Sequence, residues 1–515
     1  MAYGSLLLAR RKEIHEKIGN AVEELYLSRL EEFYEVQAHH YSRSDNIEKA
    51  YRYLKLSGQK ALRRCSNRLA FNYFKAAIDK LNQLPETTEK KKEKVNVSLL
   101  EATAARPLAY PEDSLKLLQE VERLSKEIGD GNSLAESYSQ MGLYYAVHGN
   151  PSLALKYQEK CILEAEKVKN LDLMAPLSFD LTLIYSVSGD FSKVAEIAPK
   201  NIALLEATGK QSEFFGRSTN SYSILCSHYG NSLAMMGQFK EGQKWSDKGL
   251  RFATDINHQE TMGVVEFNFG FSSLAQGDGE KTKIHFQNSV RYFEKTQTTL
   301  WLGLAYSGLG SGYIFLGKYG KALNCIENGL KIQNDAKISV MLSIHYIFLS
   351  LAHYEMGKLE NARRSIEEAV KLSQTNGEKM FEGLSLEIQG RILSKMHSSH
   401  SRKAEECIRR GMTLLDNLKL RPFCSWGYFF LGELYGDTGQ REKALENLKK
   451  AEDNFREMGM DHWLAMTYAA YADLSKRQGD LSNAEENLHN AIKILKECGA
   501  DGWVKKYEKQ LTALL

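Results

Sequence analysis

Two pairs of histidines have the side chains that a metal ion would bind. His39 and His40 are adjacent, whereas two serines separate His397 from His400. Neighbouring side chains on a helix point about 100° apart, so His39 and His40 converge on one ion only with difficulty. One buried, hydrogen-bonded histidine beside an exposed one is the favoured interpretation. The second pair has no Cys, Asp or further His pair beside it, and we predict no metal site.

A thiol and an imidazole lie close together at Cys226 and His228. Nucleophilic catalysis also requires a group that orients the base, and the sequence offers none that can be named. The segment GDGEKTK at residues 277–283 has the composition of a phosphate-binding loop but not its spacing, and it follows a predicted helix rather than a strand. We therefore predict no catalytic residue and no cofactor, and we interpret the chain as non-enzymatic.

A fixed spacing of glycines indicates which elements must position the functional residues. The glycines occur 40 residues apart at Gly237, Gly277, Gly317 and Gly357. The same spacing separates Gly149 from Gly189 and Gly439 from Gly479. A period between about 20 and 50 residues is typical of a solenoid built from stacked supersecondary units. Such a protein works through an extended surface.

Residues around each glycine repeat as well, and they describe a helical hairpin. Small residues recur seven positions before and twelve positions after the glycine, and large apolar residues lie between them. Small residues let two antiparallel helices approach closely while the large ones interdigitate. The glycine then lies at the tip, where the chain reverses with a positive φ. Each helix is expected to hold roughly 16–18 residues.

Two segments carry a family resemblance. The segments YFFLGELYGDTGQREKALENLKKAED, from Tyr428, and YIFLSLAHYEMGKLENARRSIEEAV, from Tyr346, resemble the tetratricopeptide repeat, although the period here is 40 residues. The resemblance implies an all-α superhelical solenoid of about ten hairpins. We predict an N-terminal helical segment (residues 1–85), the solenoid (residues 86–500) and a capping helix (residues 501–515). Ser399 replaces one tip glycine, and eight extra residues near 209–219 shift the phase.

The N-terminal segment resembles a different region. Three segments resemble the region that follows the ATPase module of large bacterial signalling ATPases: RRKEIHEKI (residues 10–18), AHHYSR (residues 38–43) and EKAYRYLKLSGQKAL (residues 48–62). Several members carry a class III adenylate or guanylate cyclase domain. The resemblance implies a regulatory region that couples to an ATPase or cyclase module, in cis or in trans.

Composition narrows the choice of partners and compartment. The chain has 68 basic and 65 acidic residues and a formal net charge of +3, which argues against nucleic-acid binding through a global field. Its 7 cysteines are scattered and form no Cys-x-x-Cys, as expected in a reducing cytoplasm. No stretch has the length and polarity pattern of a signal peptide or a membrane span.

The concave face is the predicted partner-binding surface, because the first helix of each hairpin would line it. The residues that project onto this face are His228, Asn231, Phe267, Asn268, Phe271, Phe315, Phe348, Tyr354 and Phe430. The asparagines could clamp a peptide backbone, since an amide donates and accepts at once. The aromatic residues could hold apolar side chains of a protein or peptide partner. Packing of the same residues in the core is an equally favoured interpretation.

The inserted segment GKQSEFFGRST offers a second candidate. A loop would expose Phe214, Phe215 and Arg217 as an anchor, whereas an extended helix would pack them inward. The leading hypothesis for function is a scaffold that regulates a signalling ATPase or cyclase. The alternative is a small-molecule sensor, in a layout similar to that of the bacterial maltose regulator, where a helical-repeat sensor follows an ATPase.

Overall fold

The computed structural model describes residues 8–111, 113–168, 171–215 and 217–514, and these ranges contain helices and no strand. Residues 1–7 of the predicted N-terminal segment lie outside the described residues. The described chain begins with α1 (Leu8–Leu25), η2 (Leu27–Phe33), α2 (Tyr34–Tyr41), α3 (Ile47–Arg63) and α4 (Asn67–Leu81). Helices α3 and α4 pack together as a hairpin, and α4 packs on the next helix.

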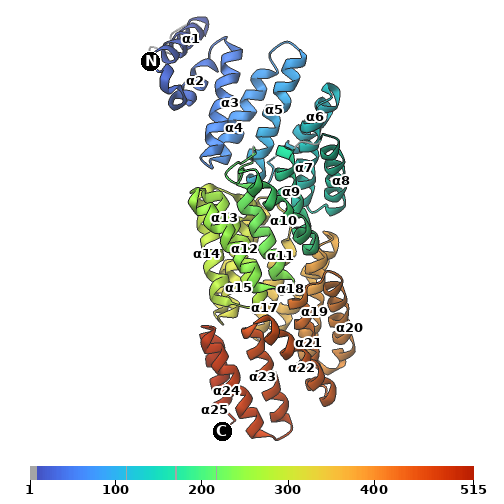
Figure 1. The fold of residues 1–515 in the computed structure, drawn as a ribbon. Coiled ribbons are helices and arrows are strands. Elements are labelled where there is room, and N and C mark those ends of the chain that lie inside the picture. The colour runs from blue at the N-terminus through green and yellow to red at the C-terminus, as the bar shows by residue number, and fades with distance from the viewer. Residues whose placement is uncertain (1–7, 112, 169–170, 216, 515) are drawn as a thin grey trace.

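Ten further hairpins follow, which confirms the predicted all-α solenoid. The first five are α5 (Thr88–Ala105) with η3 (Arg106–Leu108) and α6 (Ser114–Ile128), α7 (Gly131–Val147) and α8 (Pro151–Val168), α9 (Leu171–Ser188) and α10 (Phe191–Ala207), α11 (Ser221–Met235) and α12 (Phe239–Asp255), and α13 (Gln259–Gln276) and α14 (Gly279–Thr296). The others are α15 (Thr299–Phe315) and α16 (Tyr319–Asp335), α17 (Leu342–Glu355) and α18 (Leu359–Thr375), α19 (Lys379–Met396), η4 (Ser398–His400) and α20 (Ser401–Asn417), α21 (Arg421–Asp437) and α22 (Arg441–Met458), and α23 (Asp461–Arg477) and α24 (Leu481–Glu497). Helix α25 (Asp501–Thr512) comes last (Figure 1).

The tips have the predicted geometry. Every tip glycine of the 40-residue series has a positive φ, between 70° and 90°. A second left-handed position occurs in the turn that leads from one hairpin to the next. Glycine occupies only part of this second series, because Asn257, Gln297, Lys337 and Lys419 adopt the left-handed conformation there. The glycine pattern therefore predicts the turn within each hairpin, but it does not predict the turn that joins one hairpin to the next.

The two irregularities of the repeat both lie in connections between helices. The extra residues after Gly209 form the connection between α10 and α11, and Pro199 lies inside α10. Ser399 falls within η4, so the tip there is a short 3-10 turn and not a left-handed residue. The helices on either side keep the hairpin packing. Both irregularities thus change the connections and leave the stacked helices in place.

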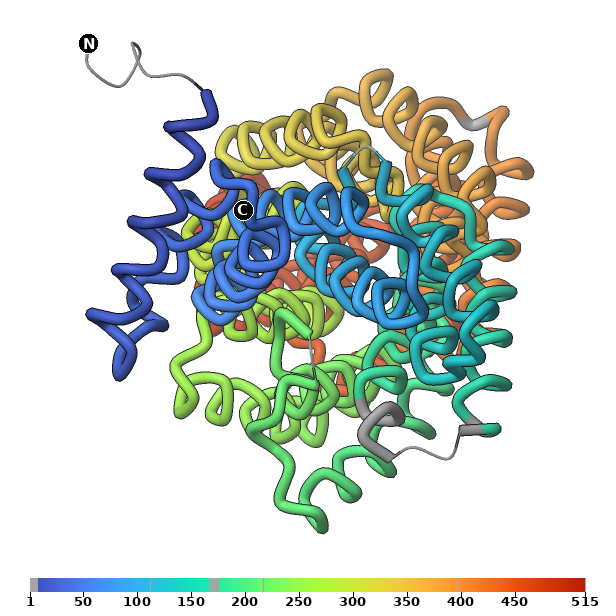
Figure 2. The backbone as a smooth tube through the Cα atoms, turned by 90° about the horizontal axis from the view of Figure 1, so that it is seen from above, coloured from blue at the N-terminus to red at the C-terminus, as the bar shows by residue number. Residues whose placement is uncertain are grey.

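Successive turns of the superhelix rest on each other. Hydrogen bonds join residues between 183 and 193 positions apart, from Cys65 with His258 to Trp503 with Ile314. In the view from above, the path runs from the teal helices through green and yellow to orange, and this path completes one circuit (Figure 2). One turn therefore holds fewer than five hairpins of 40 residues. The solenoid is closed on itself and does not present one continuous open groove.

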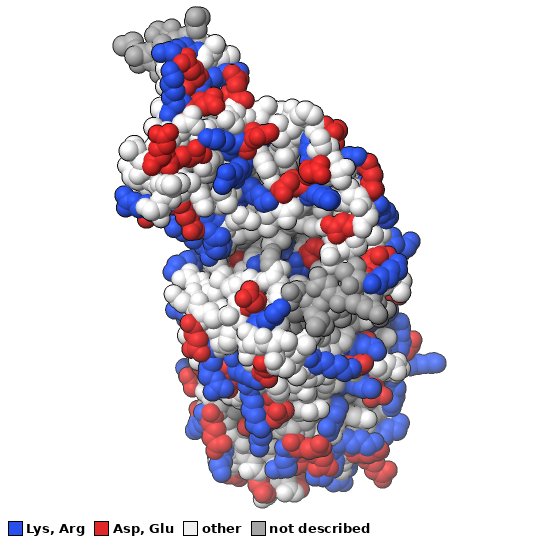
Figure 3. All heavy atoms as spheres, turned by 45° about the horizontal axis from the view of Figure 1, so that its top comes forward, with Lys and Arg blue, Asp and Glu red and all other residues white. Residues whose placement is uncertain are grey.

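Lysine and arginine are interspersed with aspartate and glutamate over the face in Figure 3. Most ion pairs join residues three or four positions apart on one helix, as between Arg363 and Glu360. That face accordingly has no large region of one sign, in keeping with the small net charge. All seven cysteines are free thiols. None of the described helices combines the length and the apolar character that crossing a membrane requires.

Candidate functional site

A cavity lies between two consecutive turns of the superhelix. Its walls come from η3, α9, α11 and α13 of one turn and from the first residues of α15 and α19 in the next. Its volume is about 870 Å³, part of which is open to solvent. This size suits a small ligand. We call it the inter-turn cavity.

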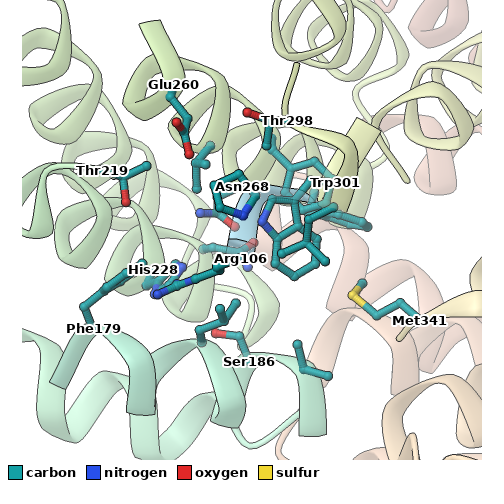
Figure 4. A pocket seen from close by; sticks show the side chains of 18 of the residues that line it. Arg106, Phe179, Ser186, Thr219, His228, Glu260, Asn268, Thr298, Trp301 and Met341 are labelled. Atoms are coloured by element: carbon teal, nitrogen blue, oxygen red, sulfur yellow. The ribbon is translucent and has the colours of Figure 1, made fainter. Parts of the chain in front are cut away.

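Arg106 lies near the centre of the inter-turn cavity (Figure 4). Its guanidinium stacks over the ring of Phe179, with 4.6 Å between the Cζ atom and the ring centroid. Its Nη1 donates to Oδ1 of Asp180 at 2.6 Å, and the Asp180 carboxylate is fully buried. Among the described residues, the side chain of Arg106 makes no other hydrogen bond. Nε and Nη2 therefore remain as donors for a ligand.

Asp180 also fixes the inserted loop. Arg217 Nη2 donates to Asp180 Oδ2 at 2.6 Å and to Glu136 Oε2 at 3.0 Å. Ser139 adds a hydrogen bond to the same Asp180 oxygen at 2.8 Å. Two arginines and two carboxylates therefore compensate one another beneath the cavity. Charge-assisted hydrogen bonds of this kind are stronger than neutral ones and hold a fixed geometry.

The two predicted asparagines are neighbours on one wall. The hydroxyl of Ser272 lies 3.1 Å both from Oδ1 of Asn231 and from the backbone oxygen of Asn268, and it can donate its one proton to either oxygen. Asn268 Nδ2 donates to the hydroxyl of Ser227 at 3.0 Å. Each side-chain amide therefore forms a hydrogen bond to the protein through one of its two polar atoms. The other ends, a donor on Asn231 and an acceptor on Asn268, have no partner among the described residues and lie at the cavity wall.

His228 is a neutral hydrogen-bonding residue of the wall. Its Nδ1 lies 2.9 Å from the hydroxyl of Thr182. Burial lowers the pKa of His228 to about 3, and the positive charge of Arg106 acts in the same direction. The imidazole consequently carries no charge at neutral pH. It contributes polarity to the cavity without adding a second cation.

Glu260 lies on the opposite side, near Thr298 (Figure 4). Asn67 Nδ2 donates to one of its oxygens at 2.9 Å, and the hydroxyl of Ser218 donates to the other at 3.0 Å. Burial raises the pKa of Glu260 to about 7, although both hydrogen bonds and Arg106 act against this. Glu260 therefore joins α4 to α13 across a superhelical turn.

A second cavity lies further along the axis, between α15, α17 and α23, with Trp503 of α25 closing it. It encloses about 540 Å³ of empty space. Phe315 packs edge-to-face on His462, whose pKa burial lowers to about 3. The rings of Trp426 and Trp463 lie 4.5 Å apart. The walls are thus mostly aromatic and uncharged.

Arg391 is the cation beside this second cavity. It forms a bidentate pair with Glu433, at 2.7 and 3.2 Å, and lies 3.7 Å from Glu355. Burial raises the pKa of Glu433, but Arg391 and Lys395 outweigh it and hold that pKa below its ordinary value. The guanidinium also faces the rings of Tyr354, Phe429 and Phe430. Arg391 thus pairs with two carboxylates of the protein, although it also lines the cavity.

The predicted concave-face residues therefore separate into two groups. Those of the inter-turn cavity are His228, Asn231, Phe267, Asn268 and Phe271. Those in or beside the second cavity are Phe315, Phe348, Tyr354 and Phe430. Most of them are less than 9% exposed. Most of them are therefore core residues, several of which also line a cavity, and their role in binding a partner stays a prediction.

The predicted loop anchor needs a correction. The segment is a loop, yet Arg217 is buried, because Asp180 and Glu136 hold its guanidinium. Phe214 packs edge-to-face against His258 at 4.8 Å, and Phe215 packs on the neighbouring core. A loop was expected to expose all three side chains, but Arg217 is buried, and Phe214 and Phe215 are only partly exposed. Loop geometry alone does not decide exposure when a buried carboxylate offers a partner.

The histidine and cysteine groupings form no reactive site among the described residues. His15 Nδ1 lies 2.9 Å from His40 Nδ1, while His39 is exposed and contacts Arg43. No described group of three His, Cys, Asp or Glu side chains has the arrangement of a metal site. Burial raises the pKa of Cys226 to about 12, which keeps this thiol protonated.

Sequence reasoning missed Arg106, Glu260 and Trp301, which all line the inter-turn cavity. Arg106 ends a helix next to a proline and carries no signal of its own. Glu260 lies in the first turn of a helix, where acidic residues are common. Trp301 is part of an apolar helix and looks like core. Only the stacking of one superhelical turn on the next brings the three together.

Comparison with known proteins identifies two of the repeats. The sequence matches the tetratricopeptide-repeat family over residues 346–376 and 427–454, the two segments recognised in the sequence. No curated protein matches the chain in sequence. Several solved structures are similar to this chain at low sequence identity, and three of them are described. A Rap protein in complex with competence and sporulation factor is 14% identical, with a TM-score of 0.41 and coverage of 66% of this chain and 99% of that one.

Two other solved structures match a larger share of this chain. The APC/C hetero-tetramer Cut9–Hcn1 is 15% identical, with a TM-score of 0.49 and coverage of 97% of this chain and 94% of that one. A signal-transduction ATPase with numerous domains and a tetratricopeptide-repeat sensor, from Pyrococcus horikoshii, is 12% identical, with a TM-score of 0.37 and coverage of 84% and 74%. At these identities the similarity concerns the helical-repeat fold alone.

Proposed function

We propose that this chain is a non-catalytic, ligand-responsive scaffold, the sensor region of a signalling ATPase or cyclase system. The observation that carries the proposal is the inter-turn cavity. Its walls belong to two superhelical turns, so a ligand that fills it touches both. A ligand bound there stabilises the stacked form of the solenoid relative to an unwound one. Binding is thereby coupled to the pitch of the whole superhelix.

The cavity favours a small ligand over a peptide that lies along the concave face. Residues from both turns close it, and the predicted groove residues are buried in its walls. A long peptide would require an open path along successive hairpins, which the stacking of turns obstructs. Of the two functions that the sequence suggested, the small-molecule sensor therefore agrees better with the geometry than a peptide groove does.

A protein neighbour is the second candidate function, and the N-terminal helices favour it. Large apolar side chains that are more than one third exposed gather there at Leu8, Ile18, Leu25, Leu27 and Val36. Exposed apolar side chains in such number commonly mark an interaction surface. The same segment carries the motifs that resemble the region after an ATPase module. An ATPase or cyclase module in cis or in trans is accordingly the partner that we propose for it.

Two experiments test these proposals. A thermal-shift screen of metabolites on the full chain should find a stabilising ligand, and hydrogen exchange should then slow at the inter-turn amides of Ser339, Val340 and Gly502. These amides donate to Val147 and Leu316 across the turns. A screen without a ligand, or a ligand that leaves these amides unchanged, contradicts the sensor proposal. For the second candidate, the DNA upstream of Met1 should encode an ATPase or cyclase module, or such a gene should lie beside it.

A further inference from the structure

The charge inside the inter-turn cavity is unusual for such an apolar space. Among the described residues that line it, Arg106 is the only Lys or Arg. The other ionisable groups are His228, which is neutral, and Glu260, whose pKa burial raises to about 7. The cation that a ligand meets at the cavity wall is therefore Arg106, whose charge Asp180 partly offsets. In a space of low dielectric, that charge selects strongly for a complementary group.

Hydrogen-bonding capacity points to the same group. Arg106 retains Nε and Nη2 as donors after its bond to Asp180, and the two lie in the planar arrangement that matches a carboxylate. Asn231 adds a donor and Asn268 an acceptor, each without a partner among the described residues. Asn231 is 5% exposed and lines the cavity. A buried amide gains from a ligand that completes its hydrogen bonds.

Aromatic rings form one part of the remaining walls, beside aliphatic residues such as Leu183, Val264 and Met380. The ring of Phe267 lies 5.0 Å from that of Phe271 and 5.6 Å from that of Trp301. Phe179 contributes its ring from the other side of the cavity, beneath Arg106 (Figure 4). Flat apolar walls favour a flat apolar body through edge-to-face and offset contacts. The body of the ligand is consequently hydrophobic and its polar part is confined to one end.

We propose that the inter-turn cavity binds a small organic acid, with a single carboxylate on Arg106 and a flat apolar body between Phe267, Phe271 and Trp301. A second group that donates or accepts a hydrogen bond can meet Asn231 and Asn268. This inference rests on the proposed sensor function and gives it a class of ligand.

A phosphate is a poorer match than a carboxylate. Asp180 already offsets part of the charge of Arg106 at 2.6 Å, and no other cation lines the cavity. A dianion would therefore keep an uncompensated charge in an apolar space, which is costly. The terminal carboxylate of a peptide is also less suitable, because the preceding residues need an exit between stacked turns.

The experiment measures binding by calorimetry and thermal shift with the full chain. The probes are phenylacetate, indole-3-acetate and 1-naphthylacetate, each compared with its own primary amide, together with phenethylamine, phenyl phosphate and a tripeptide that ends in phenylalanine. At least one acid should bind at least about tenfold more tightly than its amide, the effect of one charge-assisted hydrogen bond. An amide, amine, phosphate or peptide that binds more tightly than every acid overturns the inference.

Two variants locate the charge. Arg106→Gln can still donate to Asp180 but lacks the cation, and it should weaken acid binding by at least about tenfold while amide binding changes little. Should this variant fail to fold, Asn231→Asp keeps the pair of Arg106 with Asp180 and places a like charge beside the ligand, with the same expected loss. Arg363→Gln, on the outer face of α18, is the control and should bind acids as the parent does.

The binding results distinguish a wrong choice of ligand class from a wrong proposed function. If an uncharged or cationic probe binds, and Ser186→Trp inside the cavity abolishes that binding, the sensor proposal stands and the choice of an acid is wrong. If no probe of any charge binds and the metabolite screen also finds no ligand, both proposals are wrong. Acid binding that Arg106→Gln and Asn231→Asp leave intact places the acid elsewhere and contradicts the inference.

Discussion

Gly317 and Gly502 touch at their Cα atoms, and a Cβ built on either glycine would lie 2.6 Å from the Cα of the other. The amide of Gly502 donates to the backbone oxygen of Leu316 at 3.2 Å. A hairpin tip of one superhelical turn therefore rests directly on the first residues of α25. Gly149, Gly189 and Gly277 meet later segments in the same way, whereas nothing lies within 4 Å of a Cβ at Gly357.

The first prediction separates the two roles of a tip glycine. Gly317→Ala and Gly357→Ala impose a left-handed alanine at nearly the same φ, 70° and 73°, which costs roughly 1–2 kcal/mol each. Gly317→Ala must also force α15 and α16 away from α25, so its loss of unfolding free energy should be at least about twice as large. Urea unfolding measures both values. Equal losses would show that the contact between turns adds no stability.

The second prediction concerns the buried pair of Arg391 with Glu433. Arg391→Met leaves the Glu433 carboxylate buried without its partner, and it should reduce the unfolding free energy by about 3–5 kcal/mol. The double variant Arg391→Met with Glu433→Met should recover most of this loss, because apolar side chains replace both charges. A double variant no more stable than the single one contradicts this. Arg363→Met, in an exposed pair, is the control and should cost less than about 1 kcal/mol.

The third prediction tests what holds the inserted loop. Arg217→Met removes the guanidinium that Asp180 and Glu136 bind, so the loop should open more often. Chymotrypsin should then cut at Phe214 or Phe215 about tenfold faster than in the parent, which corresponds to about 1.4 kcal/mol of opening free energy. Glu213→Gln, an exposed change in the same loop, should leave the rate unchanged. An unaltered rate in Arg217→Met would mean that aromatic packing alone secures the loop.

The fourth prediction is a pH dependence from Glu260. Its pKa rises to about 7 in the folded chain, above that of the unfolded one, so the folded state binds this proton more tightly. The resulting stabilisation is fully present below about pH 4.5 and is lost as the pH rises through about 7, for a change of up to about 3 kcal/mol. Glu260→Gln stays neutral and lacks this component. Urea unfolding at pH 5 and pH 8 should therefore give the parent the larger decrease.

The matched control for this prediction is Glu486→Gln, at an exposed position of α24. It should reproduce the pH dependence of the parent, because the other buried ionisable groups are the same in both chains. His228 and His462 act in the opposite direction, since their lowered pKa values reduce stability as the pH falls below about 6.5. The difference between parent and variant cancels these contributions. A parent and Glu260→Gln with parallel pH curves would contradict the assignment.

Much of the fold could be predicted because the repeat is local. A tip such as Gly357, and the close approach of Gly310 to the backbone of Ala322, act within one hairpin. Their spacing predicts the helices, the turns and the superhelical class without reference to distant residues. The turns at Asn257, Gln297 and Lys337 were invisible because a left-handed conformation does not require glycine.

The candidate site could be predicted from the sequence only in part. The sequence by itself predicted His228, Asn231, Phe267 and Asn268 on the inner helices, because the 40-residue frame assigns each of them to the first helix of its hairpin. Only the tertiary structure decided that they border an enclosed cavity and that Arg106 supplies its charge. The physical reason is that the small rotation between neighbouring hairpins accumulates along the chain. Contacts between residues 183 to 193 positions apart depend on that sum, and no single repeat encodes it.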